Sequence, residues 1–482
     1  MQIDDTMQRA AAAFEEYRYT TPAARATFLE TIAAEINARR EALIETAHAE
    51  SNLPVARLNG EITRTTSQLQ LFATLIREGS WVEAVIDTAR PEHTPARPDI
   101  RRMLLPVGPV VIFGASNFPF AFSTAGGDTA SALAAGATVV IKGHPAHPGT
   151  SLMIFEAITH AISKSGMPAH TVQHVTGDGN ATGRELVMHP LTTGVGFTGS
   201  FQGGKALLDY AAQRTVPIPV FAEMSSINPV VFYPDALASQ TAQLAQTFAA
   251  SITLGMGQFC TNPGILLGLK SEALEDFISQ LGTAIAAVAP QKMLHQGICE
   301  AYTKGRSHML ETAGVTLVSE SAPPAALEAW PSLARTTGKA LLTNPALKEE
   351  LFGPYSLMVV CADKAELVAV LKSLHGQLTT TIVGTPADTA QYKDVITTQS
   401  TLAGRVILNN PPTGVEVCAA MVHGGPFPAT TDQRFTSVGT SAIRRWVRPV
   451  CFQNFTDDML PDALKAANPL GIWRQVDNQF VR

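Results

Sequence analysis

Cys260 is the residue whose type and surroundings point most directly to chemistry. It stands in the segment 255–263 (GMGQFCTNP), between an expected helix and an expected strand. The glycines and the Asn-Pro pair allow a tight turn that presents the sulfur at the end of an element. The position suits a nucleophilic thiol, although most free cysteines are small buried hydrophobes. This segment alone leaves both interpretations open.

The spacing of the cysteines does not suggest a metal site. The chain has five cysteines, an odd number, and none forms a CxxC or CxH motif. This pattern predicts a reduced protein with neither a zinc centre nor a disulfide framework. The other four are Cys299, Cys361, Cys418 and Cys451.

Two polar residues near strand ends could complete a catalytic site. Glu223 closes the apolar strand 219–223, where partial loss of solvent would raise the pKa of its carboxyl toward that of a general base. Asn117 follows a strand that ends at residue 113, and its amide could donate to an oxyanion. The alternatives are a solvated boundary residue and an asparagine that only stabilises a turn.

A glycine-rich turn and a lysine could hold a phosphate-bearing cofactor. Residues 199–204 (GSFQGG) follow the expected strand 194–198 and open a helix at Lys205. Glycines there would let the backbone approach a pyrophosphate at a helix N-terminus, although the segment departs from GxGxxG. Lys142 ends another strand, where its ammonium could reach ribose hydroxyls or point into water.

The elements that must position these residues alternate between strands and helices from residue 107 onward. Such alternation predicts βαβ units and parallel sheets, hence an α/β fold. The first hundred residues are mostly helical, with Thr21 as an N-cap before Pro22 and an apolar stripe along the helix that follows. The expected strands are 107–113, 138–141, 171–175, 194–198, 229–233 and 264–269, and the expected helices are 122–135, 151–165, 184–189 and 238–254.

The charge balance excludes partners that require a basic surface. The 482 residues include 35 Lys and Arg against 41 Asp and Glu, a net charge of −6, so we expect no nucleic-acid partner. The longest uncharged stretch, 103–127, is broken by prolines and glycines and predicts a buried strand, a turn and a helix start rather than a membrane span. The N-terminus lacks the apolar region of a secretory signal, which predicts a cytoplasmic protein.

Taken together, these segments resemble the aldehyde dehydrogenase superfamily over nearly the whole chain. The family has, in chain order, an asparagine turn, a lysine after the next strand, GSxxxG, a strand-end glutamate, GQxC and ExFGP. The matching positions are Asn117, Lys142, 199–204, Glu223, 257–260 and 350–354.

The resemblance implies two Rossmann-type α/β domains with parallel sheets and a small bridging element. Residues 1–85 and 105–225 would form the dinucleotide-binding domain, and 226–440 the catalytic domain that carries the cysteine. Residues 86–104 and 441–482 would form a bridging element of a homodimer or homotetramer.

The resemblance also assigns roles to the residues singled out above. Cys260 would attack the aldehyde, Asn117 and the Cys260 backbone N–H would hold the oxyanion, and Glu223 would activate water. No metal is expected. The residues implied to bind the cofactor, NADP or NAD, are Lys142 and Glu350 at ribose hydroxyls, Gly199, Ser200 and Gly204 near the pyrophosphate, and Phe352 beside the nicotinamide.

One branch of the superfamily is matched in more detail. Residues 113–118 (FGASNF), 142–151 (KGHPAHPGTS), 412–426 (PTGVEVCAAMVHGGP) and 448–455 (RPVCFQNF) resemble the 2,5-dioxovalerate (α-ketoglutarate semialdehyde) dehydrogenases. The related NADP-dependent long-chain fatty aldehyde dehydrogenases share this pattern, so a medium- or long-chain aldehyde is the alternative substrate. The distal carboxylate of 2,5-dioxovalerate needs a cation, for which Arg434 is a candidate.

The residues after the lysine bear on the cofactor. NAD-preferring relatives commonly have a glutamate three residues after it, where this chain has Pro145, and no carboxylate occurs from 142 to 154. His144 and His147 could tolerate or favour a phosphate, so the sequence predicts that NADP is accepted and preferred.

Three alternative functions are compatible with the same fold. Glu223 argues against a coenzyme A-dependent enzyme, because such relatives commonly lack the base. Intact Cys260, Glu223 and Asn117 argue against a non-catalytic structural or binding protein. A thiol esterase would be at most a side activity.

Overall fold

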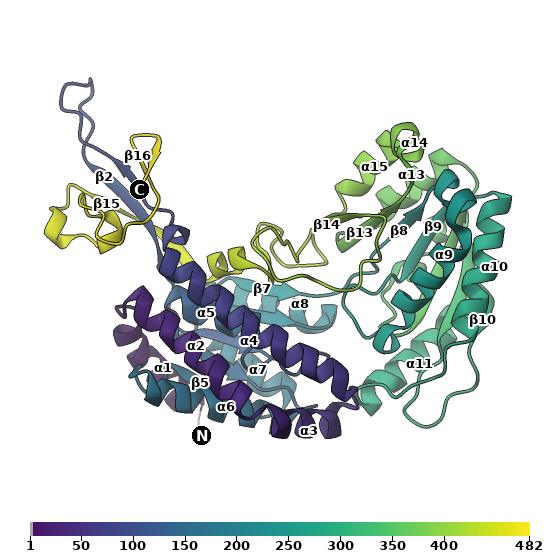
Figure 1. Cartoon of the computed structure of the whole chain (residues 1–482), viewed down its shortest axis with the longest axis horizontal. Helices are drawn as coiled ribbons and strands as arrows, with labels where there is room; N and C mark the ends of the chain where they lie inside the picture. Colours follow the sequence, from purple (N-terminus) through teal and green to yellow (C-terminus); the bar gives the residue numbers. More distant parts are fainter. Residues whose placement is uncertain (1–2) are drawn as a thin grey trace.

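The computed structural model describes residues 3–482, which form three β-sheets and the helices around them (Figure 1). The N-terminal sheet is entirely parallel and has the strand order β5-β4-β3-β6-β7. Its strands are β3 (Val110–Phe113), β4 (Val139–Lys142), β5 (Val172–Val175), β6 (Gly194–Thr198) and β7 (Val220–Glu223).

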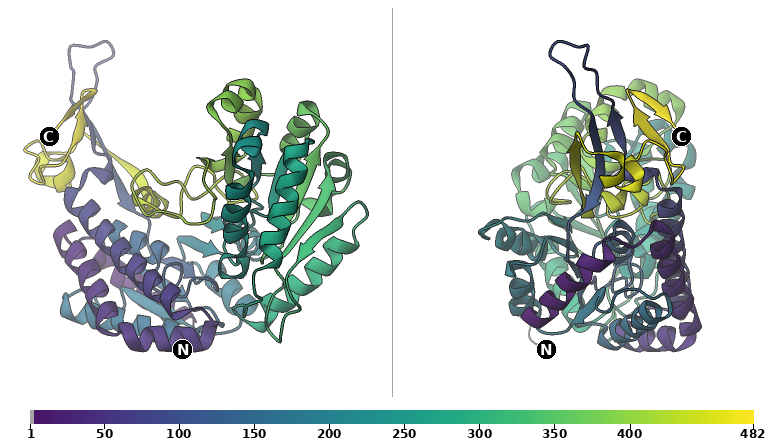
Figure 2. Two further views of the ribbon diagram at one scale, coloured as in Figure 1. Left: turned by 45° about the vertical axis from the view of Figure 1, so that its right-hand side comes forward. Right: turned by 90° about the vertical axis from the view of Figure 1, so that its left-hand side faces the viewer.

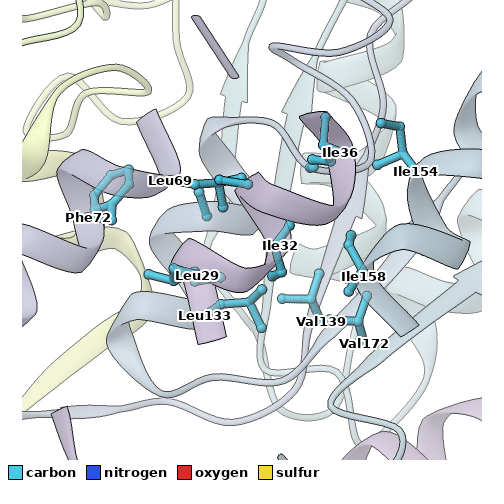
Figure 3. Packing of buried hydrophobic residues seen from close by; sticks show 14 of the residues in the cluster. Leu29, Ile32, Ile36, Leu69, Phe72, Leu133, Val139, Ile154, Ile158 and Val172 are labelled. Carbon is cyan, nitrogen blue, oxygen red and sulfur yellow. The ribbon is translucent and has the colours of Figure 1, made fainter. Parts of the chain in front are cut away.

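Helices from the first half of the chain cover both faces of this sheet. The stripe expected near residue 30 is confirmed: Leu29, Ile32 and Ile36 are buried on α2, against Leu69 of α4 and Val139 of β4 (Figure 3). Thr21 caps α2 as expected, since its hydroxyl accepts from the Ala24 N–H. The helices are α1 (Ile3–Tyr17), α2 (Pro22–Ala38), α3 (Arg40–Ser51), α4 (Val55–Glu78), α5 (Gly127–Ala135), α6 (Pro148–Lys164), α7 (Gly179–Met188) and α8 (Phe201–Ala212).

The second sheet has the order β10-β11-β12-β9-β8-β13-β14 and is parallel except for the β10–β11 pair. Its strands are β8 (Val230–Phe232), β9 (Ile265–Leu269), β10 (Thr316–Glu320), β11 (Ser332–Thr337), β12 (Tyr355–Cys361), β13 (Gln377–Val383) and β14 (Ala403–Leu408). The helices packed around it are α9 (Pro234–Thr253), α10 (Glu272–Ala286), α11 (Gln296–Glu311), α12 (Gly338–Thr343), α13 (Lys364–Ser373), α14 (Pro386–Gln391) and α15 (Lys393–Ser400).

A smaller sheet projects from one end of the molecule (Figure 2). Its strand order is β15-β2-β1-β16-β17, so it combines two strands that precede the N-terminal sheet in sequence with three from the C-terminal end of the chain. The segment between β1 and β2 extends as an exposed hairpin, as its prolines indicated. The strands are β1 (Val85–Asp87), β2 (Ile100–Pro106), β15 (Val447–Gln453), β16 (Arg474–Val476) and β17 (Gln479–Val481). Short 3-10 helices lie at Ser80–Val82, Leu254–Gly257, Pro345–Lys348, Thr440–Trp446, Asp457–Met459 and Asp462–Leu464.

The α/β class and the parallel sheets are confirmed, but several expected boundaries were wrong. The helix expected to open at Lys205 begins at Phe201, because Ser200 caps it by accepting from the Gly203 N–H. The helix expected from 122 begins at Gly127, since the preceding residues form turns. Within residues 3–482, no helix combines the length and apolarity needed to cross a bilayer.

Candidate active site

The N-terminal sheet brings polar residues together at one edge. In its register Phe113 pairs with both Lys142 and Phe197, and Thr198 pairs with Glu223, so the carboxyl ends of these strands are aligned. Strand order also reverses here, because β4 and β5 lie on one side of β3, while β6 and β7 lie on the other. Open parallel sheets bind ligands at this position.

Cys260 reaches this edge from the second half of the chain, on a turn that only glycine permits. Gly257 has a φ of 62°, and a Cβ there would lie 2.1 Å from the Gly353 carbonyl oxygen. The turn is braced by Gln258, whose side-chain oxygen accepts from the Leu294 N–H at 2.9 Å. The tight turn expected from the glycines is confirmed, and the thiol is half-buried.

Three reactive side chains meet at this turn. Sγ of Cys260 lies 3.4 Å from Nε2 of His423, and the same nitrogen lies 3.0 Å from Oε1 of Glu223. Ser437 donates to the other carboxylate oxygen at 2.8 Å. The glutamate and histidine side chains are only 2% and 0% exposed, so bulk water does not weaken their interaction.

The pKa of Glu223 moves opposite to the expected direction. Burial alone would raise it, as the strand-end position suggested, and it is the largest single influence. The charge of His423 and the hydrogen bonds from His423 and Ser437 act together in the opposite sense and lower the pKa below its ordinary value. The carboxylate is therefore the stable form near neutral pH.

The pKa of the Cys260 thiol is raised, whereas that of Glu223 is lowered. Burial and then the neighbouring Glu223 charge raise the pKa of this thiol well above its ordinary value. Without a bound ligand, the thiol therefore keeps its proton near neutral pH.

Asn117 lies beside the cysteine turn. The side-chain nitrogen of Asn117 donates to the backbone carbonyl of Gln258 at 3.2 Å, and the backbone carbonyl of Asn117 accepts from the Arg57 guanidinium at 2.7 Å. That guanidinium also lies over the rings of Phe118 and Phe259, at 5.0 and 4.7 Å from their centroids. Asn117 is thus held next to the turn that carries Cys260.

A cavity of about 500 Å³ opens at this edge and collects nearly all residues expected from the sequence. Gly204 is the exception. A Cβ there would lie 2.6 Å from the Met224 side chain, so this glycine permits close packing of α8 on β7 instead of lining the cavity. The expected residues that line it are Asn117, Lys142, Gly199, Ser200, Glu223, Cys260, Glu350 and Phe352.

The cavity fits a dinucleotide. Ser200 caps α8 at its wall, which directs the backbone N–H groups of the first helical turn toward an anion. Lys142 is buried and its pKa is lowered by desolvation, so a bound phosphate would compensate its charge, and a ribose hydroxyl would accept a hydrogen bond from its ammonium. Glu350 lines the other side, and burial raises its pKa to about 7. These residues would hold NAD(P).

His144 contributes no charge to this cavity. Burial, with the neighbouring His147, Lys142 and His295, lowers the pKa of His144 to about 3, so its ring is neutral near pH 7. It could favour a phosphate only as a hydrogen-bond donor, and Lys142 remains the cation beside it.

The sequence did not identify His423 as a site residue, and it proposed Arg434, which the structure places elsewhere. His423 stands in the segment quoted for the branch resemblance, but nothing in its local spacing indicates contact with residues 200 positions away. The Arg434 side chain is 79% exposed and pairs with Asp432, so it does not face the thiol.

The cysteine, histidine and glutamate donor atoms lie within 4.8 Å of one another, close enough to contact one metal ion. Motif spacing alone could not show this, because the three residues are far apart in sequence. Chemistry at a thiol nucleophile needs a free sulfur, and the absence of a metal cofactor stays a prediction.

Comparison with known proteins agrees with this geometry. Residues 1–297 match the sequence family described as "Aldehyde dehydrogenase family". The chain is 49% identical over 479 residues to alpha-ketoglutaric semialdehyde dehydrogenase 2 of Azospirillum brasilense, covering 99% of this chain and 91% of that protein. It is 47% identical to the alpha-ketoglutaric semialdehyde dehydrogenase of Acinetobacter baylyi, with the same coverage.

Solved structures show the same fold at lower identity. A gamma-glutamyl-gamma-aminobutyraldehyde dehydrogenase from Burkholderia cenocepacia superposes with a TM-score of 0.78 at 22% identity, covering 93% of this chain and 87% of that one. Aldehyde dehydrogenase 21 from Physcomitrella patens, in complex with succinate, gives 0.77 at 20% identity, covering 95% and 91%.

Proposed function

This chain belongs to the aldehyde dehydrogenase family and is an oxidoreductase acting on aldehydes, and we propose that it oxidises 2,5-dioxovalerate to 2-oxoglutarate with NADP⁺ or NAD⁺. The observation that carries the proposal is that Cys260 and Glu223 line a cavity that fits a dinucleotide, while His423 contacts both of them. The two relatives with high identity over almost the whole chain support this substrate, since both are named for it.

The first half of the reaction forms a covalent adduct. The Cys260 thiol loses its proton to water in the cavity, and the thiolate Sγ attacks the aldehyde carbon, which leaves the carbonyl oxygen as an anion and Glu223 ionised for the second half. The Asn117 amide and the Cys260 backbone N–H then stabilise the oxygen anion, a contribution of about 2.7–4 kcal/mol per donor in comparable sites.

A nicotinamide held in this cavity would supply the hydride acceptor, and loss of hydride from the adduct would leave a thioester on Cys260. The cavity that Cys260 lines is also lined by Phe352, Glu350, Ser200 and Lys142. These residues would hold the dinucleotide in the cavity that Cys260 also lines.

The second half releases the product. Glu223 takes a proton from water as the water oxygen attacks the thioester carbon, and the thiolate leaves. The lowered pKa of Glu223 keeps it ionised and ready for this step at neutral pH.

We propose NADP⁺ as the preferred cofactor. Pro145 lines the cavity where NAD-preferring relatives commonly have a glutamate, so no carboxylate from this segment would repel a 2′-phosphate. The buried ammonium of Lys142 would instead attract it.

We also propose a homodimer or homotetramer that assembles through the small projecting sheet. The strand β17 stands at the edge of that sheet, and Phe480 on it is 78% exposed. Light scattering of the purified protein tests this, and a monomer at micromolar concentration would contradict it.

An aldehyde panel tests the function. Reduced nicotinamide is followed with NAD⁺ and NADP⁺ for 2,5-dioxovalerate, succinic and glutaric semialdehydes, and hexanal through dodecanal. We expect the highest kcat/KM with 2,5-dioxovalerate. A kcat/KM that rises with alkyl length would instead identify a fatty aldehyde dehydrogenase with the same mechanism, and a requirement for coenzyme A would contradict hydrolysis by Glu223.

A further inference from the structure

We propose that Arg64 and Arg405 bind the distal carboxylate of the substrate and select anionic aldehydes over alkyl aldehydes. This inference rests on the proposed function and identifies the cation that such a substrate requires. The sequence offered Arg434 for this purpose, but its exposed side chain already pairs with Asp432. The carboxylate carbon of 2,5-dioxovalerate lies four C–C bonds, roughly 5 Å, from the aldehyde carbon, so its partner must lie near the thiol.

Both guanidiniums converge on one loop beside the active site. Arg64 extends from α4 and donates to the Val415 carbonyl. Arg405 extends from β14 and donates to the carbonyls of Pro412 and Gly414, the latter at 2.9 Å. These two elements come from opposite halves of the chain, and the loop that follows β14 crosses between them (Figure 1).

Contacts connect Arg64 to the reactive residues. Its guanidinium lies 5.7 Å from the centroid of the Phe122 ring, and that ring lies 6.4 Å from the His423 ring. His423 in turn contacts the Cys260 sulfur at 3.4 Å. The charge of Arg64 also acts on both Cys260 and Glu223.

Arg405 approaches from the other side of the same loop. A Cβ on Gly404 would lie 2.4 Å from the Gly424 carbonyl oxygen, so β14 runs directly beside the residue that follows His423. The charge of Arg405 acts on the Cys260 thiol and lowers its pKa against the larger effect of burial. Neither arginine lines the dinucleotide cavity, so both lie away from the expected cofactor.

Both cations still have donors without acceptors. Among residues 3–482, no hydrogen bond reaches the buried Nε atom of either arginine, and neither forms an ion pair. The carboxylates that influence Arg64 are those of Glu61, Glu416 and Glu223. Glu61 accepts from two backbone N–H groups at Oε1, its buried Oε2 has no hydrogen-bond partner among residues 3–482, and burial raises its pKa. Glu416 is exposed, and Glu223 is held by His423. Burying a guanidinium without a paired anion is costly, and a substrate carboxylate would supply that anion.

Arg57 lies close by but has a different role. Its guanidinium holds the Asn117 carbonyl and lies over two aromatic rings. It is therefore a positioning residue for the oxyanion donor, and the carboxylate is left to Arg64 and Arg405.

The test compares an anionic with a neutral aldehyde in single variants. Arg64→Met and Arg405→Met are assayed with 2,5-dioxovalerate and with pentanal, which has the same chain length without the carboxylate. We expect the ratio of kcat/KM values, anionic over neutral, to fall by about 10- to 100-fold in each variant, as for loss of a hydrogen bond to a charged group. Arg434→Met is the matched control and should leave the ratio unchanged.

The outcomes separate this inference from the proposed function. If the wild-type enzyme prefers 2,5-dioxovalerate but both methionine variants show the same anionic-over-neutral kcat/KM ratio as the wild type, the two arginines only hold the loop and the inference is overturned. If the wild-type enzyme does not prefer 2,5-dioxovalerate, the proposed function fails. Should the methionine variants not fold, Arg64→Lys and Arg405→Lys retain the charge but lose the two-pronged geometry, so the ratio should still fall. An unchanged ratio in the lysine variants would overturn the inference equally.

Discussion

Nε2 of His423 lies 3.0 Å from Oε1 of Glu223, in a pair whose two side chains are almost completely buried. Nδ1 of the same ring is buried, with no hydrogen-bond partner among residues 3–482. The carboxylate is an acceptor, so the hydrogen-bond network assigns the proton to Nε2, which donates to Glu223. One imidazole therefore orients the base and lies against the nucleophile, which links the two halves of the proposed reaction.

Glu223→Gln should separate those two halves. The amide cannot take a proton from water, so we expect steady-state turnover to fall by roughly 10²- to 10⁴-fold. Formation of the thioester needs the Cys260 sulfur and should persist. Rapid mixing at pH 8 should therefore show a burst of reduced nicotinamide close to one per active site.

Cys260→Ala is the control for that experiment. It should show neither burst nor turnover while it still binds NADP⁺. A Glu223→Gln enzyme that loses the burst together with turnover would mean that Glu223 is required before hydride transfer.

His423→Gln should move the pH profile in a direction fixed by the electrostatics. His423 lowers the pKa of Glu223, so its removal raises that pKa and protonates the base at higher pH. The acidic limb of the kcat profile should therefore shift to higher pH, and activity at pH 6 should fall more than activity at pH 8. Ser437→Ala removes one hydrogen bond from the same carboxylate and should give a smaller shift of the same sign. A shift to lower pH in either variant would contradict this description of the pair.

The sequence could predict the residues at strand ends, because local pattern marks where a strand stops. Lys142 and Glu223 are the last residues of their strands, and the turn that carries Cys260 has the glycines its backbone requires. Asn117 was identified from the turn after β3, and it does lie beside the cysteine turn.

Contacts made by irregular chain could not be predicted in this way. His423 lies outside any helix or strand, so its place beside Glu223 depends on the path of a long loop. Because the sequence did not identify this histidine, burial was the only influence considered, and the direction predicted for the pKa shift of Glu223 was wrong. Arg434 was selected because it follows His423 closely in sequence, but the arginines whose charges interact with Cys260 are Arg64 and Arg405. The domain boundaries, the roles of the site residues and the cytoplasmic location stay predictions.

Alkylation of Cys260 should become faster as pH rises, without a plateau below pH 9. The thiolate is the reactive form, and burial together with the Glu223 charge raises the pKa of this thiol. Iodoacetamide labelling of the ligand-free enzyme, located by peptide mass spectrometry, distinguishes this thiol from the exposed Cys451. Glu223→Gln removes the nearby negative charge and should speed labelling at pH 8. A plateau near pH 7 would show instead that the thiolate is stabilised without ligand.

Pro145→Glu should reverse the expected cofactor preference. Residue 145 lines the cavity near Lys142, so a carboxylate there would repel a 2′-phosphate and could accept from a ribose hydroxyl. We expect kcat/KM for NADP⁺ to fall by at least about tenfold, equivalent to about 1.4 kcal/mol, while that for NAD⁺ stays the same or rises. Pro145→Ala removes the ring without adding charge, and it should change both cofactors by a similar factor. Equal losses for both cofactors in the glutamate variant would mean that residue 145 does not face the adenosine ribose.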